Sequence, residues 1–207
     1  MTLVLGLDIA SVLIFAITGA LVAARAQLDV IGFIFIACLT AVGGGTTRDL
    51  LLGREPVFWI GDPSPVAVSA VVAVAVFFTH HLLPSRLTWI VWLDAVALSV
   101  AAAAGVAVAH DMGQDIWVQL VMGIVTGCMG GLLRDVVCNE VPLVLNQGEL
   151  YVTAALAGAA AGVIARELAA PGLWPLAACV FVTFLLRAGS IRYGWRLPSF
   201  RARPPRA

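Results

Sequence analysis

Two matched Arg-Asp pairs, Arg48-Asp49 and Arg134-Asp135, stand in strongly apolar sequence. Each pair follows a run of glycines, Gly43 to Gly45 in the first case and Gly130-Gly131 in the second. A charge in the middle of a membrane costs about 2.5–3.5 kcal/mol on insertion scales, so such side chains must face the protein interior or water. Intramembrane charges of this kind typically mark the path of an ion or a polar substrate.

Glycine runs inside a helix predict an interruption, because each Gly costs about 1 kcal/mol relative to Ala. We expect both segments to unwind or kink at the glycines, more mildly in the second, where Met129 replaces the first glycine. An interrupted helix exposes carbonyls that can replace the hydration water of a cation. Thr40 and Thr126, just before each run, would add hydroxyl oxygens. The alternative is that the glycines only permit close helix packing.

The four charges need partners inside the protein. Neighbouring residues on a helix point about 100° apart, so we expect crossed pairs, Arg48 with Asp135 and Arg134 with Asp49. These pairs would set the potential of a pore and take part in its gating. The alternative is a structural ion-pair network that only locks the two helices together.

The charged pairs belong to an ungapped internal repeat with a period of 86 residues. Residues 8–56 align with residues 94–142, and 12 of the 49 positions are identical. The identical residues are mostly glycines, charges and a proline, which chance similarity between two apolar stretches would not produce. The repeat also matches Asp8 with Asp94, near the starts of apolar segments. For these two, a role at a pore mouth and a role as a helix-start group near the interface both remain open.

The composition places these residues in a membrane. The chain is 61% hydrophobic and 12% charged, with a mean hydropathy of +1.02, whereas a soluble domain carries about 25% charged residues. A membrane-spanning helix needs about 17–25 apolar residues. Seven segments meet this requirement: 4–24, 30–53, 64–83, 88–109, 116–138, 149–168 and 172–190. The sequence therefore predicts an all-α membrane protein with seven transmembrane helices.

Three spans separate equivalent points of the repeat, so the two copies enter the bilayer in opposite senses. We expect one transmembrane domain over residues 1–190, an inverted 3+3 repeat plus a seventh helix, which is a transport architecture. Its parts are repeat one (1–86), repeat two (87–171) and the seventh helix (172–190), followed by a basic tail (191–207). Eight arginines flank the spans on one side against two on the other, Arg54 and Arg166, which predicts an outer N-terminus and a cytoplasmic C-terminus. The eight are Arg25, Arg86, Arg187, Arg192, Arg196, Arg201, Arg203 and Arg206.

The paired motifs GGGTTRDLLLGREPVFW (43–59) and GGLLRDVVCNEVP (130–142) resemble the signature segments of the prokaryotic trimeric intracellular cation channels, the TRIC family. The resemblance extends over nearly the whole chain. It implies a homotrimer in the inner membrane, with one hydrated pore per protomer between helices 1, 2, 4 and 5. It also implies passage of K+ and Na+ with modest selectivity. The chain has no Lys and nothing that matches the lysine-containing loops with which animal members hold inositol lipids.

The sequence thus favours a passive monovalent-cation channel without a cofactor, with K+ or Na+ as the permeant ion. Membrane lipids are its other expected partners, and a bound lipid is compatible with this prediction; nucleic acid is not expected. The main rival is a secondary transporter with an occluded midplane site for a small anionic substrate, and a membrane scaffold is a third alternative. We expect no enzyme and no metal site, because neither a nucleophile–base pair nor a metal cluster is evident.

Overall fold

The computed structural model describes residues 2–82, 86–146 and 149–198 of the 207-residue chain. Within these ranges the chain forms helices and no strand, apart from an isolated bridge between Glu149 and Arg196. The long helices are α1 (Thr2–Arg25), α2 (Val30–Leu52), α4 (Ser64–Thr79), α5 (Arg86–Asp111), α6 (Ile116–Val137), α7 (Val152–Glu167) and α8 (Trp174–Tyr193). The short elements are α3 (Phe58–Gly61), η1 (His80–Leu82) and η2 (Leu143–Leu145).

Five of the seven long helices in the described ranges, α1, α2, α5, α6 and α8, are long and apolar enough to cross a membrane. The other two, α4 and α7, have 16 residues each. At 1.5 Å per residue they span about 24 Å, less than the ~30 Å hydrocarbon core. The expected spans 64–83 and 149–168 are therefore longer than the helices found there. Of the expected basic tail, 191–207, the last nine residues lie outside the described ranges.

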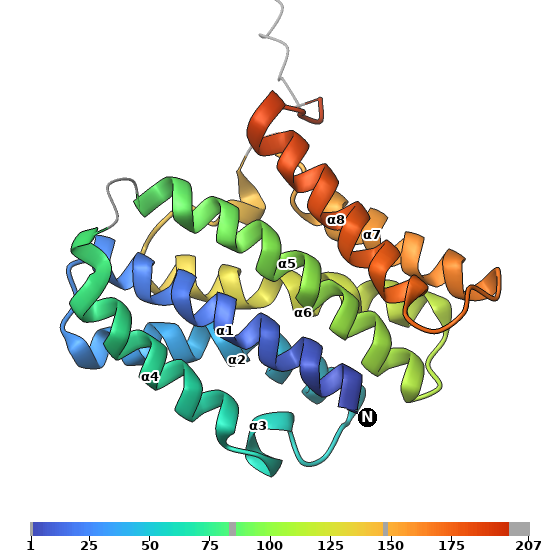
Figure 1. Cartoon of the computed structure of the whole chain (residues 1–207), viewed down its shortest axis with the longest axis horizontal. Helices are drawn as coiled ribbons and strands as arrows, with labels where there is room; N and C mark the ends of the chain where they lie inside the picture. The colour runs from blue at the N-terminus through green and yellow to red at the C-terminus, as the bar shows by residue number, and fades with distance from the viewer. Residues whose placement is uncertain (1, 83–85, 147–148, 199–207) are drawn as a thin grey trace, which may run out of the picture.

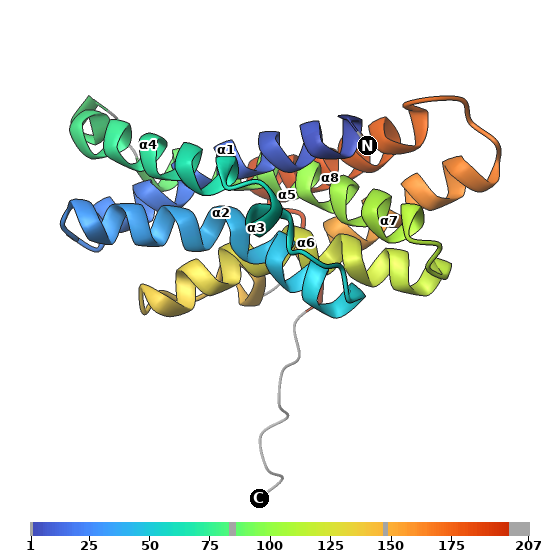
Figure 2. The ribbon, with the colours of Figure 1, turned by 90° about the horizontal axis from the view of Figure 1, so that it is seen from below.

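Four helices form the centre of the molecule: α1 packs against α2 and α5, and α6 packs against α5 and α2. The remaining long helices lie outside them, α4 on α1 and α2, α7 on α5 and α6, and α8 on α5 and α7 (Figures 1 and 2). Corresponding helices of the two sequence copies, α1 and α5, α2 and α6, α4 and α7, thus make corresponding contacts. Figure 1 shows α1 and α5 running in opposite directions across the molecule, as an inverted repeat requires.

Local chemistry explains where several helices begin and end. Asp29 accepts a hydrogen bond from the Gly32 N–H at 2.8 Å and caps the start of α2. Before α4, the Asp62 carboxylate accepts hydrogen bonds from the Ser64 N–H and hydroxyl, which lower the pKa of Asp62. Gly53 ends α2 with φ of 64°, a left-handed conformation that suits glycine.

The two glycine-containing helices are continuous. Neither Gly43–Gly45 in α2 nor Gly130-Gly131 in α6 interrupts the helix, so the expected unwinding is wrong. The carbonyls before the glycines therefore stay inside the helices. In α2, the hydroxyls of Thr46 and Thr47 donate to the carbonyl oxygens of Val42 and Gly43 at 2.7 and 2.9 Å. The helix ends that were expected to bind a cation are absent from these two segments.

Close packing explains the glycines instead. A Cβ on Gly44 would collide with the carbonyl oxygen of Thr126, and a Cβ on Gly130 would collide with the carbonyl oxygen of Thr40. Each glycine thus presses against the threonine carbonyl of the other copy, and α2 and α6 cross in direct backbone contact. Small residues that let helix backbones approach are a common device in membrane proteins. The packing alternative is the one that the structure bears out.

Candidate functional site

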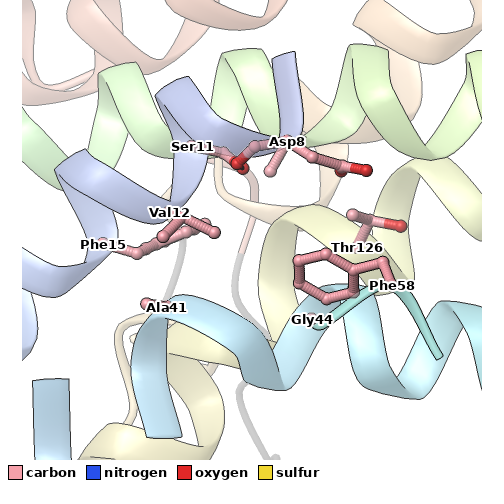
Figure 3. Close-up of a pocket in the computed structure, with 10 residues that line it drawn as sticks. Asp8, Ser11, Val12, Phe15, Ala41, Gly44, Phe58 and Thr126 are labelled. Carbon is pink, nitrogen blue, oxygen red and sulfur yellow. Dashed lines mark hydrogen bonds between the residues drawn. The ribbon is translucent and has the colours of Figure 1, made fainter. Parts of the chain in front are cut away.

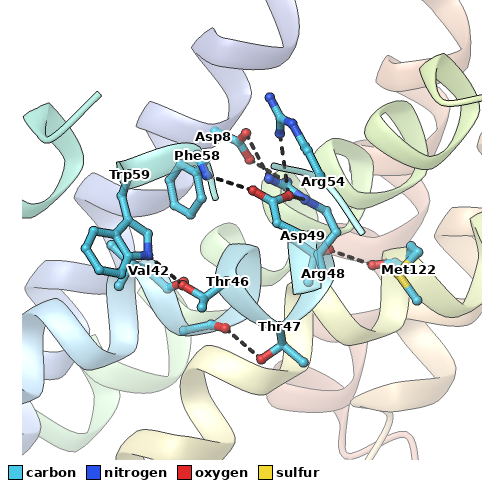
Figure 4. A network of polar contacts seen from close by, with 12 residues as sticks. Asp8, Val42, Thr46, Thr47, Arg48, Asp49, Arg54, Phe58, Trp59 and Met122 are labelled. Carbon is cyan, nitrogen blue, oxygen red and sulfur yellow. Dashed lines mark hydrogen bonds and ion pairs between the residues drawn. The ribbon is translucent and has the colours of Figure 1, made fainter. Parts of the chain in front are cut away.

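A buried group of charges, Asp8, Arg48 and Asp49, joins α1 to α2, and we call it the repeat-one cluster (Figure 4). Arg48 Nε donates to Asp49 Oδ1 at 2.8 Å, while Nη1 and Nη2 donate to the two Asp8 oxygens at 2.8 and 3.3 Å. The other Asp49 oxygen accepts the backbone N–H of Phe58 at 2.9 Å. The Phe58 ring also faces the guanidinium, 5.7 Å from its centroid to Arg48 Cζ. The cluster therefore holds α1, α2 and α3 together.

A second group with the same plan, the repeat-two cluster, consists of Asp94, Arg134 and Asp135 and joins α5 to α6. Arg134 Nε donates to Asp135 Oδ1 at 2.8 Å, and Nη1 donates to Asp94 Oδ1 at 3.1 Å. The second Asp135 oxygen accepts the backbone N–H of Leu143 at 2.9 Å. All three charged residues are at most 3% exposed. The bonds among these three residues fall at positions 86 residues after those of the repeat-one cluster.

The crossed pairs expected from the sequence, Arg48 with Asp135 and Arg134 with Asp49, are wrong. Each arginine bonds to the aspartate next to it in sequence and to the aspartate of the first helix in the same copy. An arginine side chain is long enough to fold back so that Nε reaches the neighbouring carboxylate, which leaves the far edge of the guanidinium free for a second partner. The clusters consequently lock α1 to α2 and α5 to α6, and they form no ion pair between α2 and α6.

Counted over its three residues, each cluster carries an excess of negative charge; in the repeat-one cluster the partly exposed Arg54 also reaches Asp49, with Nη1 3.5 Å from Oδ1. One guanidinium faces two carboxylates in each, so the formal charge of each cluster is −1 when all three groups are ionised. A buried ion pair stays stable only when its charges are well paired and its remaining atoms bonded. A carboxylate in excess beside a polar cavity attracts a cation. The two buried arginines are therefore compatible with a cation path.

A small cavity lies beside the repeat-one cluster (Figure 3). Its polar lining groups are Asp8, Ser11 and Thr126. Its other lining residues are Val12, Phe15, Ala41, Gly44, Gly45, Phe58 and Ala101. About 10 Å³ is open to the centre of a water molecule, which is room for about one water. The cavity thus lies where α1, α2, α5 and α6 meet and holds a polar but narrow space.

The sequence predictions for the pore residues are met unevenly. Of the predicted residues, the cavity brings together Asp8, Gly44, Gly45 and Thr126. Thr40 does not line it; its hydroxyl is buried and donates to the Ile36 carbonyl at 2.6 Å. The other predicted residues that lie off the cavity lining are Gly43, Arg48, Asp49, Asp94, Gly130, Gly131, Arg134 and Asp135.

Around the repeat-two cluster, side chains occupy the corresponding space. The Tyr151 hydroxyl donates to Asp94 Oδ2 at 2.7 Å, and Arg134 Nη1 also donates to the Thr18 hydroxyl at 3.1 Å. A Cβ on Gly127 would lie 2.9 Å from Leu98 Cδ1, so Leu98 fills the interface there. Tyr151 has no counterpart in the first copy, where position 65 is a proline.

Behind Tyr151 lies a buried arginine that the sequence analysis placed on the cytoplasmic side. Arg187 of α8 is 0% exposed, and its Nη1 donates to Glu149 Oε2 at 2.8 Å. Its Cζ lies 4.9 Å from the centroid of the Tyr151 ring. No periodicity in the sequence pairs residues 149 and 187, and α8 has no copy in the repeat, so only the fold reveals this contact. Arg187 therefore forms an internal contact of the fold and is not a surface charge.

A family model described as "Glycine transporter" matches this chain twice, over residues 5–81 and residues 91–167. The second match begins and ends 86 residues after the first, so it independently reproduces the internal repeat. Together the two matches cover most of the chain.

Proteins with similar sequences are membrane proteins. The chain is 36% identical over 204 residues to the inner membrane protein YadS of Escherichia coli, covering 96% of each chain. A crystal structure of the TRIC trimeric intracellular cation channel orthologue from Rhodobacter sphaeroides is 43% identical, with a TM-score of 0.91, covering 94% of this chain and 100% of that one. A prokaryotic TRIC channel crystallised in 0.5 M KCl is 29% identical, with a TM-score of 0.87, covering 95% and 99%.

The fold and its repeated clusters define a helical membrane protein built from two copies of one unit. The chain belongs to the prokaryotic TRIC family, to which the twofold match and these similarities assign it. The resemblance of the two signature segments is thereby confirmed.

Proposed function

We propose that this protein is a passive channel for monovalent cations, K+ and also Na+, with a path inside each protomer of a homotrimer. The observation that carries the proposal is the likeness, at 43% identity and over nearly the full length of both chains, to a protein named as a trimeric intracellular cation channel. The similar TRIC channel crystallised in KCl supports the same function.

The proposed path runs where α1, α2, α5 and α6 meet. The cavity beside the repeat-one cluster lies there, and the Asp8 carboxylate and the Thr126 hydroxyl line it. The Asp8 carboxylate in the lining favours a cation over an anion. Since α2 and α6 are continuous, oxygen atoms of side chains, not helix-end carbonyls, would offset the loss of hydration water. With room for about one water, this conformation corresponds to a closed state of the path.

We also propose where the channel lies and how it is oriented. We place it as a multi-pass protein in the prokaryotic inner membrane, with the two copies inverted and lipid around the trimer. Without Arg187, seven arginines still flank the proposed cytoplasmic side against two, Arg54 and Arg166, on the other. The N-terminus is therefore proposed to be outside and the C-terminus inside. The proposed function includes no cofactor. Asp94, buried in its cluster, locks α5 to α6, whereas Asp8 borders the path.

Recordings from the purified protein in a planar bilayer test this function. With a KCl gradient, the single-channel current should reverse near the equilibrium potential of K+, and Na+ should substitute with a modest shift. A reversal near the equilibrium potential of Cl−, or the absence of unitary currents, would contradict a cation channel. Gly6→Ala, near the start of α1, is exposed and adds no side-chain contact because nothing lies within 4 Å of the added Cβ. It provides a surface variant prepared in the same way.

A second candidate is a secondary transporter for a small carboxylate-bearing substrate. The family description "Glycine transporter" favours it, as does a cavity without an open path. Reconstituted vesicles distinguish the two functions. A transporter gives saturable counterflow of labelled glycine and no unitary currents, whereas a channel gives currents and no counterflow.

A further inference from the structure

The two ends of the molecule carry a pair of charges that the repeat conserves in position but reverses in sign. Arg25, the last residue of α1, pairs with Glu140 beyond α6, with Nη1 3.3 Å from Oε2. Shifting both positions by 86 residues gives Asp111, the last residue of α5, and Arg54 beyond α2. The repeat therefore places a possible Arg54–Asp111 pair opposite the observed Arg25–Glu140 pair, with the charges exchanged.

The backbone shows that these positions are equivalent in space as well as in sequence. The Arg54 N–H donates to the Asp49 carbonyl at 2.8 Å, and the Glu140 N–H donates to the Asp135 carbonyl at 2.8 Å. Beyond α1 and α5 the chain turns alike, with Leu28 N–H bonded to the Ala23 carbonyl. Its counterpart is the bond from Gln114 N–H to the Ala109 carbonyl. Figure 1 shows the ends of α2 and α5 on the side of the molecule opposite the ends of α1 and α6.

In the structure only one of the two pairs is formed. Arg54 Nη1 lies 3.5 Å from Asp49 Oδ1 (Figure 4), and the Arg54 side chain is 39% exposed. Asp111 is exposed and forms no ion pair with any residue in the described ranges. Asp49 does not depend on Arg54, because Arg48 Nε and the Phe58 N–H already bind its two oxygens at 2.8 and 2.9 Å.

The end without the second pair carries a surface pocket. This pocket of about 580 Å³ lies beside Arg54 and is lined within residues 49–60, including Asp49, Glu55 and Pro56. At the other end, the Arg25–Glu140 pair ties α1 to the segment after α6, across the seam between the two copies. One end is therefore tied by an ion pair across the seam, whereas the other end is not.

We propose that Arg54 controls cation entry at this end of the molecule by moving between two carboxylates, Asp49 and Asp111. When Arg54 pairs with Asp111, it ties α5 to the segment after α2 and closes this end, as Arg25 and Glu140 tie the opposite end. When it rests on Asp49, as in this structure, the tie is absent. This proposal rests on the proposed conduction of cations.

Charge variants test the control of entry in bilayer recordings. Arg54→Gln and Asp111→Asn should each raise the ratio of open to closed time about two- to fivefold, as the loss of an exposed ion pair allows. The double variant should show no further increase. Asp115→Asn, in the same loop, is the matched control. Additive single effects would overturn the proposal.

Crosslinking tests the movement without relying on conduction. In a chain whose four native cysteines are replaced, Arg54→Cys with Asp111→Cys should be joined by a bis-thiosulfonate spacer faster than Arg54→Cys with Asp115→Cys. Arg25→Cys with Glu140→Cys is the positive control. Equal rates for the test pair and the Asp115 pair would contradict the movement. Crosslinking of the test pair without any current from the natural protein would instead count against the channel and leave the movement standing.

Discussion

The two charge clusters share a skeleton and differ in their surroundings. In both, one arginine bonds to the next residue and to an aspartate of the preceding helix. Asp8 of the repeat-one cluster borders a cavity, and its side chain is 8% exposed. Asp94 of the repeat-two cluster is 0% exposed and accepts a hydrogen bond from Tyr151. A duplicated unit has thus kept its structural bonds in both copies, while the side chains around the two aspartates differ.

The side chains packed around the repeat-two cluster come partly from outside the aligned repeat. Arg187 of α8 stacks on Tyr151 and pairs with Glu149, and neither α8 nor Tyr151 has a counterpart in the first copy. The seventh helix therefore does more than add a span, because it supplies the charge that backs the repeat-two cluster. We therefore expect the repeat-two cluster mainly to stabilise the fold and the repeat-one cluster mainly to influence ions.

Removing an arginine from a cluster should have the largest effect on stability. Arg134→Met leaves Asp94 and Asp135 buried without their cation, so we expect a loss of about 3–5 kcal/mol in the free energy of unfolding. Arg48→Met should cost less, because the cavity lets water reach Asp8. Unfolding of the purified protein in mixed micelles measures both, with the exposed Arg192→Met as control. A larger loss of unfolding free energy for Arg48→Met than for Arg134→Met would contradict this expectation.

Alanine at the helix crossing should have the next largest effect, and here the two copies should agree. Gly44→Ala and Gly130→Ala both push a Cβ into a backbone oxygen, so we expect each to cost about 1–3 kcal/mol in the free energy of unfolding. Gly6→Ala, with nothing within 4 Å of the added Cβ, is the control. If either crossing variant unfolds like the control, the close contact between α2 and α6 does not exist in the membrane.

Tyr151→Phe tests whether a contact of the repeat-two cluster affects stability without affecting ion selectivity. The variant keeps the ring on Arg187 but removes the donor to Asp94, and a hydrogen bond to a charged group contributes about 1.5–3 kcal/mol. We expect the melting temperature to fall while the ratio of K+ to Cl− permeability stays unchanged. The exposed Tyr193→Phe should change neither quantity. A changed permeability ratio with an unchanged melting temperature would place Tyr151 on the ion path.

The smallest effect on stability is expected for the matched threonines. Thr126→Val and Thr40→Val each remove a hydroxyl that bonds to the carbonyl four residues earlier, at a cost of about 1 kcal/mol or less. Only Thr126 lines the cavity, so only Thr126→Val should lower the single-channel K+ conductance. Equal conductance changes in both variants would show that the path does not follow this cavity.

The sequence predicted what depends on position along the chain. The 86-residue repeat and the helical nature of the chain follow from identical glycines and charges at equal spacing and from apolar length. The behaviour of Gly43–Gly45 and Gly130-Gly131 could not be predicted, because the intrinsic cost of glycine in a helix is offset here by contacts with Thr40 and Thr126 of the facing helix. That contact is a tertiary one, and propensity does not contain it.

The partners of the charges show the same limit. Asp8 and Asp94 were recognised as matched, but their bonds to Arg48 and Arg134, 40 residues further along the chain, depend on how the first two helices of each copy pack. The direction of the Cβ on the helix did not decide which carboxylate each arginine binds, because the arginine side chain is long enough to turn back toward the next residue. The burial of Arg187 and its bond to Glu149 could not be predicted either, because an arginine near a helix end reads as a topology signal whether or not it is buried.

Neutralising one aspartate in each cluster separates the effects of the two clusters on ions. Asp8→Asn removes one negative charge beside the cavity, and Asp94→Asn removes one from the repeat-two cluster, with little change of shape in either case. In a KCl gradient, Asp8→Asn should move the reversal potential clearly toward that of Cl−, whereas Asp94→Asn should leave it near that of K+. Equal shifts in the two variants, or a shift only in Asp94→Asn, would contradict the account.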